Sequence, residues 1–79
     1  MTIYVLLDNA YEYGGAFSSE EKALEAAISL FSNIKGIKLK LSRAEKYEDV
    51  RFINVYLTDG EHEWNPFLIL IREIDEMER

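Results

Sequence analysis

The order of apolar and polar residues predicts five strands and one helix. Residues 3–7 form a short apolar run of β-forming residues without alternation, which is typical of an interior strand covered on both faces. Residues 11–17 alternate at first and then contain two glycines, which indicates a second strand with a bulge or a sharp bend. Residues 37–41 alternate and predict a strand with one buried face, and the polar residues 42–49 predict a loop. Residues 50–58 predict a further strand from their β-branched and aromatic content, with Ile53, Val55 and Leu57 on one face and Phe52 and Tyr56 on the other.

The helix is the clearest local signal. Ser18 and Glu21 match the S-x-x-E capping box, in which the serine hydroxyl accepts from the N3 amide and the carboxylate accepts from the N-cap amide. Apolar residues then recur with helical spacing over 24–31, so one face of the helix is committed to a core. Asn33 and Gly36 supply candidate C-terminal stops.

The segment 65–79 supports two interpretations. Asn65 and Pro66, followed by apolar residues at helical spacing, suit an N-capped helix with proline at its first position. The apolar run over 67–71 follows the preceding strand after one short turn, and a β-hairpin explains it more economically. We therefore expect a strand to about Ile74, with a frayed or helical end after it.

These elements define a single α+β domain over residues 1–79, in the order β-β-α-β-β-β, with one helix packed on one face of a small antiparallel sheet. With 48% hydrophobic and 13% aromatic residues, the chain belongs among folded sequences. The absence of cysteine removes disulfides, thiolate metal sites and cysteine nucleophiles, so we expect a cytoplasmic protein. No signal peptide is recognisable, and the longest apolar run, over 67–71, falls far short of the roughly 20 residues that span a bilayer.

Charge is distributed unevenly along the chain, whose formal net charge is -6. The segment 35–46 contains one acidic residue, Glu45, against five basic residues, so the acidic excess lies elsewhere; the basic residues are Lys35, Lys38, Lys40, Arg43 and Lys46. Lysines on an exposed edge strand commonly prevent pairing with other chains, and we interpret this basic strip as edge protection or plain solvation. Direct nucleic-acid binding is not expected, because isoleucine and leucine, and not aromatics, alternate with the basic residues.

Two clusters next to predicted turns combine carboxylates with large aromatic side chains and form the candidate partner-binding surface. Carboxylates attract a basic patch, while Tyr and Trp are over-represented among interface hot spots. In the alternative interpretation, the rings close the ends of a small core and the acids keep the fold soluble. The candidate residues are Tyr11, Glu12 and Tyr13 in the first cluster, and Asp59, Glu61, Glu63 and Trp64 in the second.

The one histidine, His62, lies between Glu61 and Glu63. Histidine with carboxylates can bind zinc or manganese, but in a strand these two glutamates face one way and the histidine the other. We therefore expect no metal or other cofactor. We also expect no enzyme activity, because general acid catalysis needs a dry pocket, which a domain of this size rarely encloses.

The opening of the chain, with Tyr4-Val5-Leu6 and the helix start Phe17-Ser18-Ser19-Glu20-Glu21-Lys22-Ala23, resembles the strand, strand, capped-helix opening of several small uncharacterised bacterial and phage domains. The acidic, cysteine-free format is similar to that of phage anti-defence inhibitors and toxin-immunity proteins as a broad class. This resemblance and the charge layout predict a small intracellular protein that acts by binding a basic site on another protein, such as a nucleic-acid-handling protein. The alternatives are a homodimer or other homo-oligomer paired through an apolar sheet face or edge strand, and a regulatory domain that binds a small ligand between helix and sheet.

Overall fold

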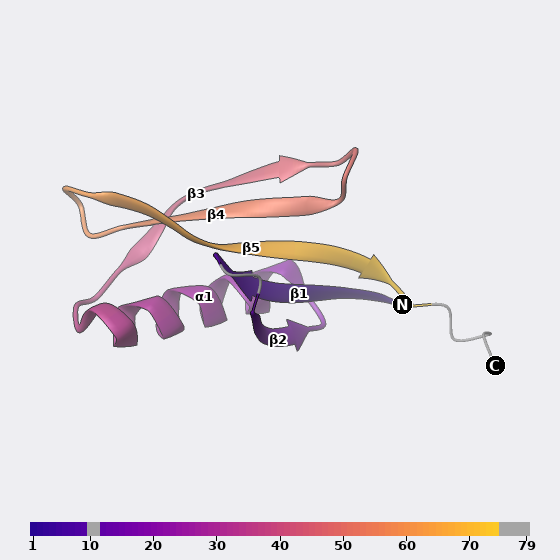
Figure 1. Ribbon diagram of the computed structural model, residues 1–79, viewed down its shortest axis with the longest axis horizontal. Helices are drawn as coiled ribbons and strands as arrows, with labels where there is room; N and C mark the ends of the chain where they lie inside the picture. Colours follow the sequence, from indigo (N-terminus) through magenta and orange to yellow (C-terminus); the bar gives the residue numbers. More distant parts are fainter. Residues whose placement is uncertain (10–11, 75–79) are drawn as a thin grey trace.

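One helix and five antiparallel strands form two layers in the computed structural model, which describes residues 1–9 and 12–74 (Figure 1). The strands follow the order β2-β1-β5-β4-β3 in one sheet, so β2 and β3 are its edges. This architecture confirms the predicted α+β class and the order β-β-α-β-β-β. The elements are β1 (Thr2–Asp8), β2 (Tyr13–Phe17), α1 (Glu20–Lys35), β3 (Lys40–Tyr47), β4 (Phe52–Thr58) and β5 (Glu63–Glu73).

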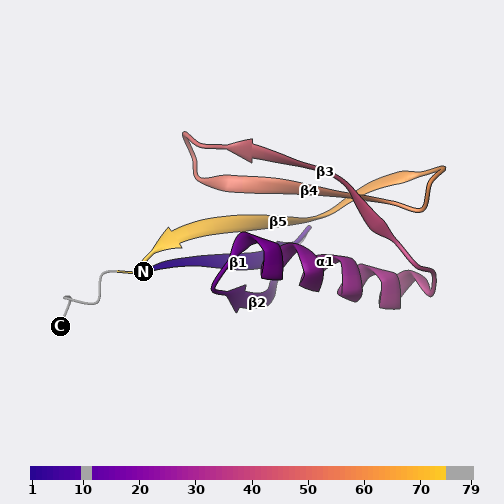
Figure 2. The same ribbon diagram turned by 180° about the vertical axis from the view of Figure 1, so that it is seen from behind.

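The helix covers only one face of the sheet. In Figure 1 β1 passes in front of α1, and in Figure 2, seen from behind, α1 passes in front of β1. The core lies between these layers and follows from alternation along the strands: Ile53, Val55 and Leu57 of β4 are fully buried, as their spacing predicts. The other members of the buried cluster are Leu6, Ala23, Ala27, Phe67 and Ile69.

The strand β5 occupies the middle of the sheet. It pairs with β1 from Asp8 opposite Phe67 to Thr2 opposite Glu73, and with β4 on its other side. The first and last strands of the chain are therefore neighbours, although they are far apart in sequence. Because β5 has a strand on each side, it connects the β1–β2 half of the sheet to the β3–β4 half.

The strand interpretation of the C-terminal segment is confirmed, since β5 continues to Glu73. Pro66 lies inside this interior strand, where a missing backbone N–H would normally break the ladder. The β4–β5 register is irregular at this point, and the Asn65 side-chain amide donates to the Val55 carbonyl oxygen at 2.8 Å. The end predicted for 75–79 lies outside the described residues.

Two glycines bend β2, as the sequence predicts. The register between β1 and β2 shifts between Leu6 and Leu7. Gly15 has a φ of 134°, and a Cβ atom at this position would lie 3.0 Å from the Phe17 ring. Any other residue would therefore be strained by its backbone conformation and by this contact. The bulge is confirmed.

The helix begins one residue later than its capping box predicts. Ser19 is the N-cap: its backbone is extended and its Oγ accepts from the Lys22 N–H at 3.2 Å. The prediction of Ser18 as the cap, paired with Glu21, is therefore wrong. Phe17 ends β2 with its ring packed against the core, so Ser18 serves as the connection and the second serine becomes the cap.

The helix ends at the predicted stop. Gly36 adopts the left-handed conformation with a φ of 73°, and its N–H donates to the Ser32 carbonyl oxygen at 2.8 Å. The Ser32 hydroxyl then accepts from the N–H of Leu39, a buried residue, at 3.1 Å. These two bonds direct the chain from α1 into β3.

The limits predicted for the third strand are wrong. Instead of a strand over 37–41 and a loop over 42–49, β3 covers Lys40–Tyr47. Two of the alternating apolar residues, Ile37 and Leu41, are exposed, so the alternation does not mark a buried strand face. At this edge of the sheet β3 presents mainly polar residues to solvent and packs on the core through Ala44, which is why its sequence resembles a loop.

Replacing Ser19 by alanine should lower the free energy of unfolding by about 1 kcal/mol, because the Lys22 N–H loses its acceptor. Ser18→Ala, one residue earlier, is the matched control and should have little effect. Urea denaturation of both variants measures the difference. Equal losses, or a larger loss for Ser18→Ala, would show that the helix starts at the earlier serine.

Candidate protein-binding surface

The helix α1 covers one face of the sheet, and no other described element lies on the opposite face (Figure 1). That opposite face carries partly exposed apolar side chains. The strands β1 and β5 are apolar at nearly every position, so each places one set of side chains in the core and the other set on this face. The prediction that β1 is an interior strand is confirmed, but cover on both of its faces is wrong. One helix cannot cover both faces of the sheet.

The strand register brings these apolar side chains together. Val5 lies opposite Leu70 and Leu7 lies opposite Leu68, while Phe52 of β4 pairs with Leu70 from the other side. The result is a continuous apolar area across three adjacent strands, with each side chain partly exposed. We call it the helix-free strip, and its residues are Ile3, Val5, Leu7, Phe52, Leu68 and Leu70.

A network of polar side chains borders the helix-free strip on β3 and β4. The Arg43 guanidinium lies over the Tyr56 ring, 4.0 Å from its centroid, and forms ion pairs with Glu45 and Glu63. Both tyrosine hydroxyls of this network donate to Glu45 Oε1, Tyr47 at 3.0 Å and Tyr56 at 3.3 Å. The positive charge of Arg43 is therefore already paired with two carboxylates within the molecule.

Aromatic rings extend the apolar area toward the edge strand. The Tyr47 and Phe52 rings stack with centroids 4.9 Å apart and planes 12° apart. Tyr47 remains 42% exposed, which is high for a ring already packed on one side. The face thus has an apolar centre, an aromatic margin and a border of ion-paired side chains.

The first predicted cluster lies at the β1–β2 connection. Tyr11 is outside the described residues. Asp8 closes the connection by accepting from the Glu12 N–H at 2.9 Å through its carboxylate, and its own N–H donates to the Glu12 carbonyl oxygen at 3.0 Å. Tyr13 starts β2 opposite Leu7 and is 70% exposed.

The residues of the second predicted cluster have different structural roles. Asp59 organises the β4–β5 turn, because its Oδ1 accepts from the N–H groups of Glu61 and His62 at 2.8 and 2.7 Å. These backbone bonds, with that from His62 contributing most, lower the pKa of Asp59 from 3.8 to about 2. Glu61 itself is exposed in the same turn.

Glu63 belongs to the polar border of the helix-free strip. Its carboxylate accepts from the Ser42 hydroxyl at 2.5 Å and pairs with Arg43. The hydrogen bond from Ser42 and then the contact with Arg43 lower the pKa of Glu63. This carboxylate is therefore ionised at neutral pH and already has partners.

Trp64 lies on the opposite, helix-covered side of the sheet, where it is half-buried. Its ring contacts Phe31 edge-on at 6.0 Å, and the Lys35 ammonium lies 5.1 Å from the ring centroid. Both contacts come from α1, so the ring fills the gap between the end of the helix and β5. This position fits the interpretation of Trp64 as the margin of the core.

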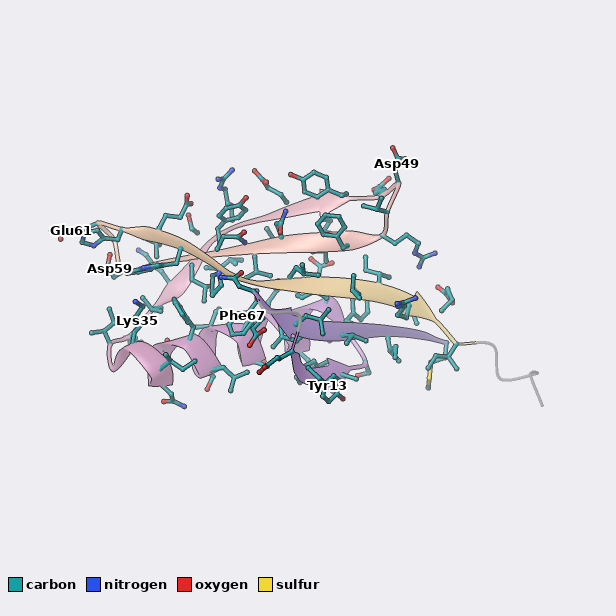
Figure 3. The ribbon with its side chains drawn as sticks, viewed as in Figure 1. Tyr13, Lys35, Asp49, Asp59, Glu61 and Phe67 are labelled. Carbon is teal, nitrogen blue, oxygen red and sulfur yellow. The ribbon has the colours of Figure 1, made fainter. Side chains whose placement is uncertain are left out.

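The predicted residues do not converge on one surface. Figure 3 shows Tyr13 and Glu61 far apart, with Glu61 at one end of the molecule. Glu63 and Trp64 are consecutive in β5 and face opposite sides of the sheet. Sequence reasoning missed the helix-free strip, whose signal is the unbroken apolar character of 3–7 and 67–71 in a chain with one helix.

Within residues 1–9 and 12–74, no three His, Cys, Asp or Glu side chains are grouped so that they could hold a metal ion. Over the same ranges, α1 does not have the length and apolar character of a membrane-crossing helix.

The chain matches no protein-family model, no curated protein and no solved structure. Its function is therefore argued from the geometry of its own residues.

The depressed pKa of Asp59 makes stability depend on pH. The folded pKa of about 2 lies below the ordinary 3.8, so the ionised carboxylate favours the folded state. This contribution is complete above about pH 4 and is lost as the pH falls through about 2. Between about pH 4 and about pH 2, the free energy of unfolding of Asp59→Asn should therefore fall less than that of the wild type, as measured by urea denaturation. Glu61→Gln is the control and should keep the wild-type slope; the same slope for Asp59→Asn would contradict the role of Asp59.

Trp64→Ala should lower the free energy of unfolding by about 2 kcal/mol, less than for a fully buried ring because Trp64 is half-buried. The loss comes from the contacts with Phe31 and Lys35. Thermal melting of the variant measures it. A melting temperature equal to that of the wild type would show that the ring contributes nothing to the core and is free for a partner.

Proposed function

We propose that this protein acts by binding another protein, with no chemistry of its own, and that the helix-free strip is the contact surface. The observation that carries this proposal is the group of six apolar side chains on three adjacent strands, which the described part of the chain leaves uncovered. Contiguous exposed apolar patches are typical of protein–protein contact sites.

The surroundings of the helix-free strip support the same proposal. Protein interfaces combine an apolar centre with a polar rim, and Tyr and Arg are enriched among the residues that contribute most to affinity. Here Tyr47, Tyr56 and Arg43 stand at the border of the strip. They are held by hydrogen bonds and ring contacts, so little side-chain entropy would be lost when a partner binds.

Nucleic-acid binding on this face is less well supported. A sheet that stacks bases needs open aromatic faces beside unpaired basic groups. Arg43 covers the Tyr56 ring, Tyr47 stacks on Phe52, and the Arg43 charge is matched by Glu45 and Glu63.

The carboxylates also favour binding over catalysis. Asp59 and Glu63 both have lowered pKa values because they accept structural hydrogen bonds. A general acid needs the opposite shift, which a dry pocket produces by raising the pKa. These two groups therefore hold the fold together and are not suited to donate protons near neutral pH.

Leu70→Lys tests the proposal, because it places a charge at the centre of the helix-free strip, between Val5 and Phe52. Proteins retained from a cell extract by the immobilised wild type should be lost with this variant, and titration should show affinity reduced at least tenfold. Ile34→Lys on α1, where the side chain is 72% exposed, is the matched control and should retain them. Thermal melting checks that both variants fold. Equal retention by Leu70→Lys and wild type would refute the proposal.

A second candidate is a basic partner held at the acidic perimeter, as in the predicted block of a basic site on a nucleic-acid-handling protein. One observation favours it: Glu12 and Glu61 are exposed, and they lie outside the helix-free strip and its polar border, in a chain of net charge -6. Glu12→Gln with Glu61→Gln should slow association with such a partner and flatten its salt dependence. Unchanged association rates would exclude this candidate.

A further inference from the structure

We infer that the occupant of the helix-free strip is a second copy of this chain, packed face to face in a two-fold symmetric dimer. This inference rests on the proposed function, since it assigns the partner of the same surface. Three features of the described residues support it: the charge balance of the face, its shape and area, and the protection of both sheet edges.

The charge balance distinguishes this face from the rest of the molecule. Two copies with net charge -6 repel each other over most of their surfaces. The helix-free face, however, lacks this acidic excess, because it carries three basic residues, Lys40, Arg43 and Arg72, beside Glu45 and Glu63. Arg72 reaches this face through its pairing with Ile3, and Lys40 through its pairing with Thr58, which lies opposite Glu63. Two copies can therefore approach through this face without the repulsion that opposes other orientations.

The same balance makes a strongly charged partner a poor fit. A basic protein would find the carboxylates of Glu45 and Glu63 already paired with Arg43. Separating these ion pairs would leave charged groups without partners in an interface that excludes water, which costs free energy. A neutral, apolar surface suits the strip, and the second copy supplies one of matching chemistry.

Shape and area also suit a second sheet. Five strands spaced about 4.8 Å apart, with about seven residues each rising about 3.3 Å, cover roughly 24 Å by 23 Å. That is about 550 Å² of flat area for the whole face, so an interface near the standard of about 800 Å² per partner would include the polar border as well as the helix-free strip. Two twisted sheets pack well over such an area when their strands are aligned within about 30°.

Pairing through the sheet edges is disfavoured by the sequence of the edge strands. The strand β3 carries Lys40, and it carries Lys46, which pairs with Glu20 of α1 at 3.1 Å; lysine side chains protect an edge from further pairing. The strand β2 has only five residues and is bent by Gly14 and Gly15. Self-association should therefore use the apolar face and not extend the sheet.

Analytical ultracentrifugation of the full chain tests the inference. From about 1 µM to about 500 µM, the wild type should pass from monomer to dimer with little dependence on moderate salt, because the contacts are apolar. Leu70→Lys should raise the dissociation constant at least tenfold, and Ile34→Lys should leave it unchanged. Val5→Thr, which keeps the side-chain shape and the strand preference, should weaken the dimer severalfold and serves if Leu70→Lys fails to fold.

The outcomes separate the two proposals. A wild type that stays monomeric over the whole concentration range overturns the second copy as occupant. In that case the proposed function fails only if Leu70→Lys retains the same proteins from the cell extract as the wild type does. A dimer that survives Leu70→Lys and Val5→Thr but is broken by Ala16→Pro in β2 would be an edge-paired dimer and would overturn the inference. A dimer broken by the face variants alone supports it.

Discussion

The pairing of β1 with β5 is the interaction on which the rest of the structure depends. It joins the first and last strands over seven residue pairs, from Thr2 with Glu73 to Asp8 with Phe67. Through this ladder the β1–β2 hairpin and the β3–β4–β5 unit become one sheet, and α1 gains a continuous surface to cover. Pairing strands so far apart in sequence costs loop-closure entropy before their contacts form. We therefore expect the β1–β5 pairing to form late in folding and to complete the sheet cooperatively.

This pairing also creates the exposed apolar face. Both strands are apolar at nearly every position, which is typical of strands covered on two sides. Leu6 and Ile69 face α1 and are fully buried, whereas their neighbours Val5, Leu68 and Leu70 face away and remain partly exposed. One helix covers only one face of this five-stranded sheet, so the apolar side chains on the other face stay partly exposed. This helix-free face is the strongest indication of how the protein works.

The sequence predicted the fold class, the element order, the helix end at Gly36 and the buried side of β4, because each depends on local patterns of period two or 3.6. It failed where local patterns compete. Two adjacent serines gave a cap one residue too early, and the edge strand β3 resembled a loop because its outward side chains are polar.

The candidate site was harder to predict, since it depends on register between distant strands. Asp59 and Glu63 looked like free acids in sequence, but they bind the turn backbone and the Ser42 and Arg43 side chains. Conversely, Arg43, Tyr47 and Tyr56 come together only because β3 pairs with β4 in one particular register. The apolar runs 3–7 and 67–71 indicate a surplus of apolar side chains, but no spacing along the chain shows which strand will lie beside which. The residues that make up the helix-free strip are therefore identified only in the folded sheet.

Covering the helix-free strip should also affect folding stability. A domain of this size buries only about 60% of the surface of its unfolded chain, so its stability is small from the start. The strip keeps Val5, Leu68 and Leu70 partly in water, where they contribute less than their apolar surface allows. A partner that binds the folded chain alone adds to stability by mass action. The proposed binding is therefore linked to folding: the side chains that leave the isolated sheet incomplete would also supply the free energy of association.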